Sequence, residues 1–534
     1  MTYQTALGSL ADAVEARVAA WDDTDARQRL WAKDHTLWTA EPRPEIEDRL
    51  GWLRLPDTMR PHLSGIEALV ADVRTAGFTH VVLLGMGGSS LAPDVFAATF
   101  GTAAGYPSLQ VLDSTHPAAV AATTAAIDPD RTLFVVSSKS GTTVEPLSLL
   151  AHFWSVVAET SERPGDHFVA ITDPGTGLAE RARSDEFRAV FETIPDVGGR
   201  YSALTHFGLV PAALIGVDIG DLLDRAAAVD VDDAFHLGAV LGEAALAGRD
   251  KATWLVSDTF RAFPAWVEQL VAESTGKSGT GILPVADEAV GAPTVYGADR
   301  VFVSVSVAGD DDVAHRAAVE LLEFAGHPVV RITVDDPTDL AGEMYRAEIA
   351  VAMAGSVLGI HPFDQPDVQL AKQLAQQAID GTLDAGEIPE AVPGTADFAE
   401  TVRAFVDEAG DRAFVALQAF IEPTQAATER LQRARHLVRD RKRVATTLGF
   451  GPRFLHSTGQ YHKGGPNTGR FIQIVDHPAP ELPVPGTDLT FSRLVSGQAD
   501  GDHQALTEVG RHVLRICLGD DIDGGLDALV EAVS

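Results

Sequence analysis

The chain has 534 residues, a formal net charge of −35 and a single cysteine. This length exceeds what one hydrophobic core usually serves, so we expect two or three packed units. The negative charge argues against nucleic acid and membranes as partners, and a single cysteine excludes an intrachain disulfide and a cysteine-rich metal site. Acidic residues from Asp12 to Asp23 stand where a signal peptide would need basic and then apolar residues. We therefore expect a cytoplasmic protein.

The first elements in chain order predict a helical arm followed by two α/β domains. Apolar residues between Leu7 and Trp21 recur at steps of three and four, which indicates a helical arm over residues 1–60. Beyond it, short apolar runs alternate with helix-length stretches, the pattern of strands buried on both faces of a parallel sheet. The runs lie at 80–85, 109–113, 132–138 and 167–172, and then at 252–258, 300–307 and 327–335. We expect domains over 61–220 and 221–390, each a mainly parallel sheet flanked by helices.

The rest of the chain offers weaker signals. Residues 384–395 concentrate glycine, proline and acidic residues, which is typical of a solvated connection. A helical segment is expected over 397–448 and one last buried strand over 512–519. We interpret 391–534 as a helical segment and the C-terminal completion of the second domain, with extra α/β elements.

The run VVLLGMGGSSLAP, residues 81–93, is a buried strand that opens into glycines before a helix. Bare backbone N–H groups and the helix dipole favour an anion there, with Gly85, Gly87, Gly88 and Ser89 as candidates. A dinucleotide fingerprint would require glycine in place of Ser90, so nucleotide binding is weakly supported, and an ordinary tight turn is the alternative.

A second turn from strand to helix, FVVSSKSGTTVEP, covers residues 134–146. Its hydroxyl and backbone N–H groups can surround a phosphate monoester. The alternative is a capped helix start in which Glu145 complements the helix dipole. The candidate phosphate-binding residues are Ser138, Lys139, Ser140, Thr142 and Thr143.

The segment WVEQLVAESTGKSGTG contains Gly-Lys-Ser, but Val271 stands where a triphosphate loop requires glycine, so we reject that reading. Glu273 follows three apolar residues and precedes a glycine-rich loop. A partly desolvated carboxylate at this position is a candidate general base, and a solvated acid at a helix end is the alternative.

Two later segments carry candidates for proton transfer. GIHPFDQPDVQLAK places Lys372 on a helix predicted to begin at a proline, although such a lysine alone is ordinary at a surface. FLHSTGQYHKGGPNTG holds His456 and His462, which can move protons near neutral pH or serve structurally. The two histidines lack a clear third ligand, so we expect no metal.

Together, GMGGSS, SSKSGTTVEP, GGRYSALTHFGL, ESTGK, FDQPDVQLAK and HSTGQ resemble the motifs of the glucose-6-phosphate isomerase family over residues 80–465. STGQYHKGGPNTG looks most like the isomerase half of bifunctional transaldolase/glucose-6-phosphate isomerases. The resemblance implies two sugar-isomerase domains. It also implies interconversion of glucose 6-phosphate and fructose 6-phosphate by ring opening and a cis-enediolate, without a cofactor.

The resemblance also implies roles for single residues. Glu273 would carry a proton between C1 and C2, His456 and Lys372 would open the ring, and Arg200 would stabilise the enediolate. The substrate phosphate would be bound by Ser89, Ser138, Lys139, Ser140 and Thr143. One departure is that Lys372 precedes His456 by 84 residues, the reverse of the usual family order. His462 and His361 are therefore second and third candidates for the ring-opening histidine.

Family members usually form homodimers, so a homodimer is expected. No transaldolase half is evident, and a separate transaldolase partner is neither indicated nor ruled out. The alternatives to the isomerase are a non-catalytic phosphosugar-binding regulator and a phosphosugar isomerase of broader specificity that includes mannose 6-phosphate.

Overall fold

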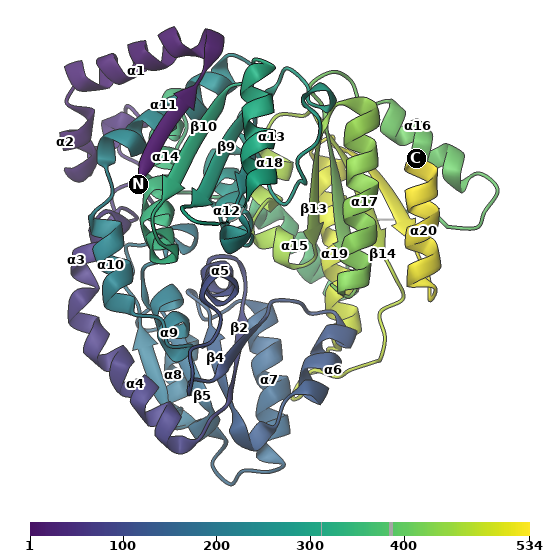
Figure 1. Cartoon of the computed structure of the whole chain (residues 1–534). Coiled ribbons are helices and arrows are strands. Elements are labelled where there is room, and N and C mark those ends of the chain that lie inside the picture. The colour runs from purple at the N-terminus through teal and green to yellow at the C-terminus, as the bar shows by residue number, and fades with distance from the viewer. Residues whose placement is uncertain (311, 384–387) are drawn as a thin grey trace.

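The computed structural model describes residues 1–310, 312–383 and 388–534, and it contains three five-stranded sheets (Figure 1). The expected mixed α/β fold with parallel sheets flanked by helices is confirmed. Every helix in the described residues is too short or too polar to cross a bilayer.

The first sheet is wholly parallel and has the order β3-β2-β4-β5-β6. Its strands are β2 (His80–Gly85), β3 (Ser108–Leu112), β4 (Thr132–Ser137), β5 (Phe168–Thr172) and β6 (Ala189–Glu192). The apolar runs of β4 and β5 are buried along their whole length because helices cover both faces. These helices are α4 (Leu63–Ala76), α5 (Leu91–Phe100), α6 (Pro117–Ala126), α7 (Val144–Ala158), α8 (Gly177–Ser184) and α9 (His206–Leu214).

The second sheet has the order β1-β10-β9-β7-β8, and only its edge strand β1 is antiparallel. Its strands are β1 (Thr2–Ala6), β7 (Lys251–Val256), β8 (Leu283–Val285), β9 (Arg300–Val307) and β10 (Val329–Val334). The associated helices are α1 (Ala11–Asp23), α2 (Ala26–Trp31), α3 (Leu55–Thr58), α10 (Ile219–Ala227), α11 (Val231–Leu246), α12 (Phe263–Thr275), α13 (Val313–Phe324) and α14 (Leu340–Leu358). One continuous apolar core runs through the first two units.

The N-terminal arm differs in one detail from the sequence expectation. The helix expected from the apolar spacing is present as α1, but the first residues form β1, which pairs with β10 at the edge of the second sheet. The helical period gives no signal for a short, mostly exposed edge strand, because only pairing with a distant partner fixes it.

The C-terminal region forms a third, wholly parallel sheet of its own, with the order β11-β15-β14-β12-β13. Its strands are β11 (Glu390–Ala391), β12 (Phe414–Phe420), β13 (Ala445–Phe450), β14 (Gly469–Val475) and β15 (His512–Cys517). Its helices are α15 (Val368–Ile379), α16 (Phe398–Asp407), α17 (Gln425–Lys442), α18 (Gly459–Gly464), α19 (Phe491–Glu508) and α20 (Ile522–Val533). A separate apolar core lies within this unit.

This arrangement corrects the expectation for 391–534. The prediction of a helical segment over 397–448 was wrong, because it contains β12 and the start of β13. The described strands of the region pair with one another and not with the second sheet, so they do not complete that sheet. β12 is a seven-residue, mainly apolar run buried throughout, and such a run is compatible with a strand or a buried helix until its neighbours are known. The connection expected over 384–395 begins in residues outside the described ranges, and the domain boundaries stay predictions.

Glycine allows the first unit to pack closely at its glycine turn. A Cβ on Gly88 would overlap the backbone of Gly199. We expect Gly88→Ala to lower the free energy of unfolding by about 1–3 kcal/mol, since overpacking forces the backbone apart. Gly65→Ala is the control: it lies in the exposed part of α4 with open space around it, and alanine favours a helix. Denaturant unfolding measures the stability of both variants. If Gly88→Ala were as stable as the control, the predicted clash with Gly199 would be wrong.

Candidate active site

The hydroxyl-rich turn joins β4 to α7 at the carboxyl edge of the first sheet. Gly141 has a φ of +65°, and a Cβ there would lie 2.8 Å from the side chain of Thr176. The turn therefore folds tightly, with Ser138 donating a hydrogen bond to Thr143 (3.2 Å) and Thr142 donating one to Ser140 (3.0 Å). The N-terminus of α7, a helix of 15 residues, lies directly behind these hydroxyls. This geometry suits a phosphate group.

Lys139 of the same turn is held by neighbours. Its Nζ lies 2.5 Å from an Asp173 carboxylate oxygen and donates to the carbonyl of Pro195 at 3.2 Å. Burial lowers the pKa of Lys139 and raises the pKa of Asp173. An incoming phosphate would therefore compete with Asp173 for this ammonium group.

The glycine turn forms the 3₁₀ helix η5 (Gly87–Ser89) after β2. Gly87 has a φ of +54°, and a Cβ there would meet the carbonyl oxygen of His456 at 2.8 Å. Gly87 thus lets the third unit approach the first, in addition to any contact with an anion. Ser89 is the hydroxyl of this turn that lines the cavity described below.

Glu273 lies near the C-terminal end of α12, where it is held from two sides. One carboxylate oxygen pairs with Arg200 at 3.0 Å, and the other accepts a hydrogen bond from Gln269 at 3.0 Å. Gln269 also donates to the backbone carbonyl of His456 at 2.8 Å. The side chain of Glu273 is 16% exposed, so the carboxylate is partly desolvated but open to a ligand.

Arg200 belongs to the 3₁₀ helix η8 (Gly199–Tyr201) and is 3% exposed. Its guanidinium donates to Ser274, Gln365 and the backbone carbonyls of Pro362 and Asp364, in addition to its pair with Glu273. These contacts join η8, α12 and the segment that leads into α15.

Lys372 lies one turn into α15, and the start of this helix is fastened by Gln460 of α18. Gln460 donates to the carboxylate of Asp367 (2.5 Å) and to the carbonyl of Gly276 (2.9 Å), and it accepts from the Asp367 backbone N–H (2.9 Å). The segments ESTGK, FDQPD and HSTGQ are therefore bonded to one another directly.

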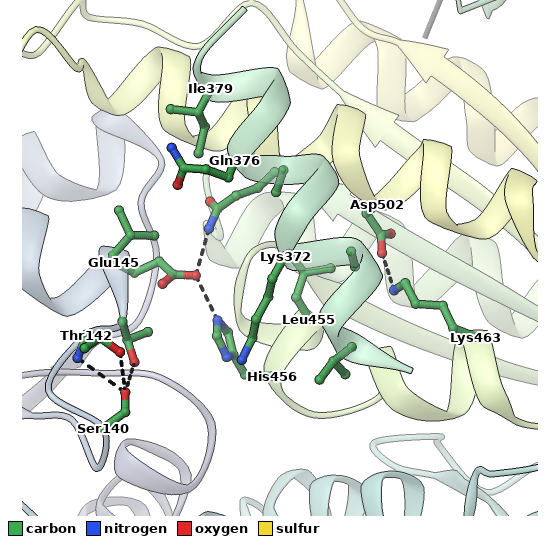
Figure 2. A pocket seen from close by; sticks show the side chains of 16 residues that line it. Ser140, Thr142, Glu145, Lys372, Gln376, Ile379, Leu455, His456, Lys463 and Asp502 are labelled. Carbon is green, nitrogen blue, oxygen red and sulfur yellow. Dashed lines mark hydrogen bonds and ion pairs between the residues drawn. The ribbon is translucent and has the colours of Figure 1, made fainter. Parts of the chain in front are cut away.

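His456 ends the 3₁₀ helix η12 (Arg453–His456), which follows β13. Its Nε2 lies 2.8 Å from a carboxylate oxygen of Glu145, the second residue of α7, and Figure 2 shows both side chains with Lys372 beside the imidazole. Burial opposes ionisation of Glu145, but the neighbouring His456, a backbone hydrogen bond and Lys372 together outweigh it and lower the pKa of Glu145. An ionised Glu145 requires the proton on Nε2 of His456, which leaves Nδ1 for a ligand.

The other two candidate histidines, His462 and His361, lie away from the cavity that His456 lines, which is described below. His462 is buried against Gln418, and burial lowers its pKa well below the usual value. The Nε2 of His361 lies 2.9 Å from the carbonyl of Pro44, and burial lowers the pKa of this histidine as well. Neither histidine lines the cavity that His456 lines.

One cavity of about 340 Å³ brings the candidates together. Glu273, Lys372 and His456 line it, although they come from α12, α15 and η12. The phosphate candidates that line it are Gly87, Gly88, Ser89, Lys139, Ser140 and Thr143. Arg200 and Ser138 stand behind the wall. Thr142 faces an adjoining cavity of about 250 Å³, shown in Figure 2, which shares Lys372 and His456 with the first.

Sequence reasoning missed several residues of the site. Asp173, Gln269 and Gln365 line the cavity, and Glu145 was noted only as a complement to the helix dipole. Only the strand-end position of Asp173, after β5, could have pointed to it, because side chains gather at the carboxyl edge of a parallel sheet. In the described residues no group of three or more His, Cys, Asp or Glu side chains is arranged to hold a metal.

Residues of η12 also line a separate cavity of about 390 Å³. Arg453 pairs there with Asp94 (2.8 Å) and Asp113 (3.0 Å) of the first unit, which fixes the segment that carries His456. Glu268 of α12 lines the same cavity, and burial together with a nearby carboxylate raises its pKa to about 8.

On this α/β fold, the cavity brings a hydroxyl-rich turn at a helix N-terminus together with a carboxylate, a lysine and a histidine. Residues 70–298 match the family model of phosphoglucose isomerase. The glucose-6-phosphate isomerase of Rubrobacter xylanophilus is 30% identical over 390 residues, which cover 62% of this chain and 89% of that protein. The probable glucose-6-phosphate isomerase of Methanococcus maripaludis is 26% identical over 57% of this chain and 80% of the relative. The chain belongs to the phosphoglucose isomerase family and is an aldose-ketose isomerase.

Solved structures agree on the fold. A hypothetical protein from Thermus thermophilus superposes with a TM-score of 0.59 at 25% identity and covers 72% of this chain and 100% of its own. A glucose-6-phosphate isomerase from Chlamydia trachomatis superposes with a TM-score of 0.53 at 21% identity, covering 71% of this chain and 80% of its own. The second likeness supports the arrangement of sheets and helices alone.

The raised pKa of Glu268 makes a prediction about stability. Its ordinary pKa is 4.5, so between that pH and about 8 the native state keeps a proton that the unfolded chain releases, and stability falls as pH rises. We expect Glu268→Gln to be more stable than the parent by about 5 kcal/mol above pH 8, with the gain vanishing near pH 4.5. Chemical denaturation at both pH values measures it. Glu159→Gln, at an exposed position, is the control, and an equal gain at both pH values would contradict the prediction.

Proposed function

We propose that this protein interconverts glucose 6-phosphate and fructose 6-phosphate, with Glu273, Lys372 and His456 as the proton-transferring groups. The observation that carries the proposal is that these three side chains line one cavity together with Ser140 and Thr143 of the hydroxyl-rich turn. The substrate follows from the relatives, several of which are named glucose-6-phosphate isomerase.

The phosphate is placed at the turn before α7. Ser140 and Thr143 donate hydroxyl hydrogen bonds, Ser89 adds a third hydroxyl from η5, and the positive end of the α7 dipole favours the dianion. Lys139 supplies a positive charge once the phosphate competes with Asp173. A chain with net charge −35 repels anions in general, so this local cradle has to supply the attraction.

Ring opening is assigned to His456 and Lys372. The step transfers a proton to the ring oxygen and removes one from the hydroxyl on C1, which requires a donor and an acceptor near the same bond. Because Glu145 occupies Nε2 of His456, Nδ1 is the atom assigned to proton exchange with the substrate. The side chain of Lys372 lines the same cavity as His456.

Glu273 is assigned the transfer between C1 and C2. Its carboxylate removes the proton from C2 of the open aldose, an enediolate forms, and the same carboxyl group returns the proton to C1. Arg200 orients Glu273 through the 3.0 Å pair, and its permanent charge lies beside that carboxylate. This favours the negative charge that develops on the enediolate.

The proposed site is assembled from one chain, since α12, α15 and η12 of the same polypeptide supply its acid–base groups. The homodimer and the cytoplasmic location stay predictions, and a separate transaldolase partner is neither indicated nor ruled out.

Replacing the proposed base should separate binding from turnover. We expect Glu273→Gln to lower kcat by about 10³-fold, because the amide cannot accept the C2 proton, while affinity for a hexitol 6-phosphate changes little. A coupled assay measures turnover, and calorimetry with the hexitol phosphate, which has no carbonyl to isomerise, measures binding. Glu268→Gln, on the same helix but facing the other cavity, should keep turnover. Turnover in Glu273→Gln near that of the parent would refute the assignment.

Replacing the proposed ring-opening histidine should also impair catalysis. We expect His456→Gln to lower kcat by about 10²-fold with cyclic hexose 6-phosphate as substrate, since glutamine cannot exchange protons. His477→Gln, whose side chain is 67% exposed in the same unit, is the matched control and should behave like the parent. Equal activity of the two variants in the coupled assay would return the role to His462 or His361.

A further inference from the structure

Gln498 of α19 reaches the carboxylate that holds His456. Its Nε2 donates to the same Glu145 oxygen at 2.7 Å, and its Oε1 accepts from the hydroxyl of Thr115 at 3.0 Å. Gln498 is 4% exposed and Thr115 is fully buried. A hydroxyl that donates to the amide oxygen fixes the orientation of the amide, so its NH₂ group faces Glu145.

Close helix packing makes this reach possible. On α19, Gly497 and Gly501 lie against α15: a Cβ on Gly497 would meet the Ile379 side chain at 2.7 Å, and one on Gly501 would overlap the backbone of Ala375. The two helices therefore lie in direct contact beside Glu145, and Gln498 stands between the two glycines in sequence. α19 of the third unit is thus fastened to the helix that carries Lys372.

We propose that Gln498 is a positioning residue for the isomerisation, and that its amide holds the Glu145 carboxylate in place on the imidazole of His456. The inference rests on the proposed function. It extends the site from the groups that face the substrate to a buried chain, Thr115–Gln498–Glu145–His456, in which each hydrogen bond fixes the next.

The charges around Glu145 come from several elements. His456 of η12 and Lys372 of α15 both favour its ionised form, and the buried Lys463–Asp502 pair of α18 and α19 lines the same cavity. The amide of Gln498 is a neutral donor among these groups. It stabilises the carboxylate without adding a charge that would compete for the phosphate.

Two substitutions at this position should have opposite pH dependence. Gln498→Leu removes a donor from the ionised carboxylate, so the pKa of Glu145 rises and kcat/KM should fall by about tenfold, most strongly at acidic pH. Gln498→Glu places a second carboxyl group beside Glu145. The new carboxyl group can donate a hydrogen bond only while it is protonated. The decrease in kcat/KM of this variant should therefore be largest at alkaline pH, where the two carboxylates repel each other. The measurement is the pH profile of fructose 6-phosphate conversion in a coupled assay.

Controls separate a positioning role from a structural one. Gln504→Leu alters a glutamine of the same helix whose amide bonds Glu508 at an exposed site, and it should leave the profile unchanged. Thr115→Val frees the amide to turn and should give a smaller loss, about threefold, of the Gln498→Leu type. If Gln498→Leu does not fold by circular dichroism, Gln498→Glu and Thr115→Val decide the case. Profiles parallel to that of an active parent would overturn the inference, whereas an inactive parent would overturn the proposed function itself.

Discussion

The site depends on one buried guanidinium. Arg200 is almost fully buried, and a buried charge is stable only when its donors are satisfied. It meets this requirement by bonding to α12, to the Pro362–Gln365 segment and to Glu273. The side chain of Arg200 therefore fixes both Glu273 and the segment that leads into α15 to the first unit. Lysine, with a compact ammonium group, could not bridge so many acceptors.

The third unit completes the site by close backbone contact, and this explains the unusual order of the motifs. A Cβ on Gly276 would overlap Tyr461, and Gly87 meets the backbone of His456 in the same way, so these glycines serve first to let separate segments approach one another. Lys372 precedes His456 in the chain because α15 leads into the third sheet, and the histidine follows β13 of that sheet. The order of Lys372 and His456 along the chain does not matter for the cavity, because α15 and η12 both contribute side chains that line it.

The sequence alone determined the fold class and indicated several of the residues that line the cavity. Apolar runs such as 132–138 that alternate with helix-length stretches are typical of strands in a covered parallel sheet, and the loops after such strands gather at one edge. Sequence reasoning correctly gave α/β units and placed Glu273, Lys372 and His456 in informative segments. It could not choose among His456, His462 and His361, because all three are histidines near family motifs.

Only the tertiary structure decided that His456 lines the cavity, that Arg200 lies behind the wall, and that the C-terminal region forms its own sheet. Strand pairing and the contacts of a buried charge depend on residues that lie tens to hundreds of positions away, and neither residue type nor local spacing encodes those distances. Glu145 and Gln498, for example, are 353 residues apart and share a hydrogen bond of 2.7 Å. The mainly apolar sequence of β12 predicts that the strand is buried, but only pairing with its neighbours determines in which sheet it lies.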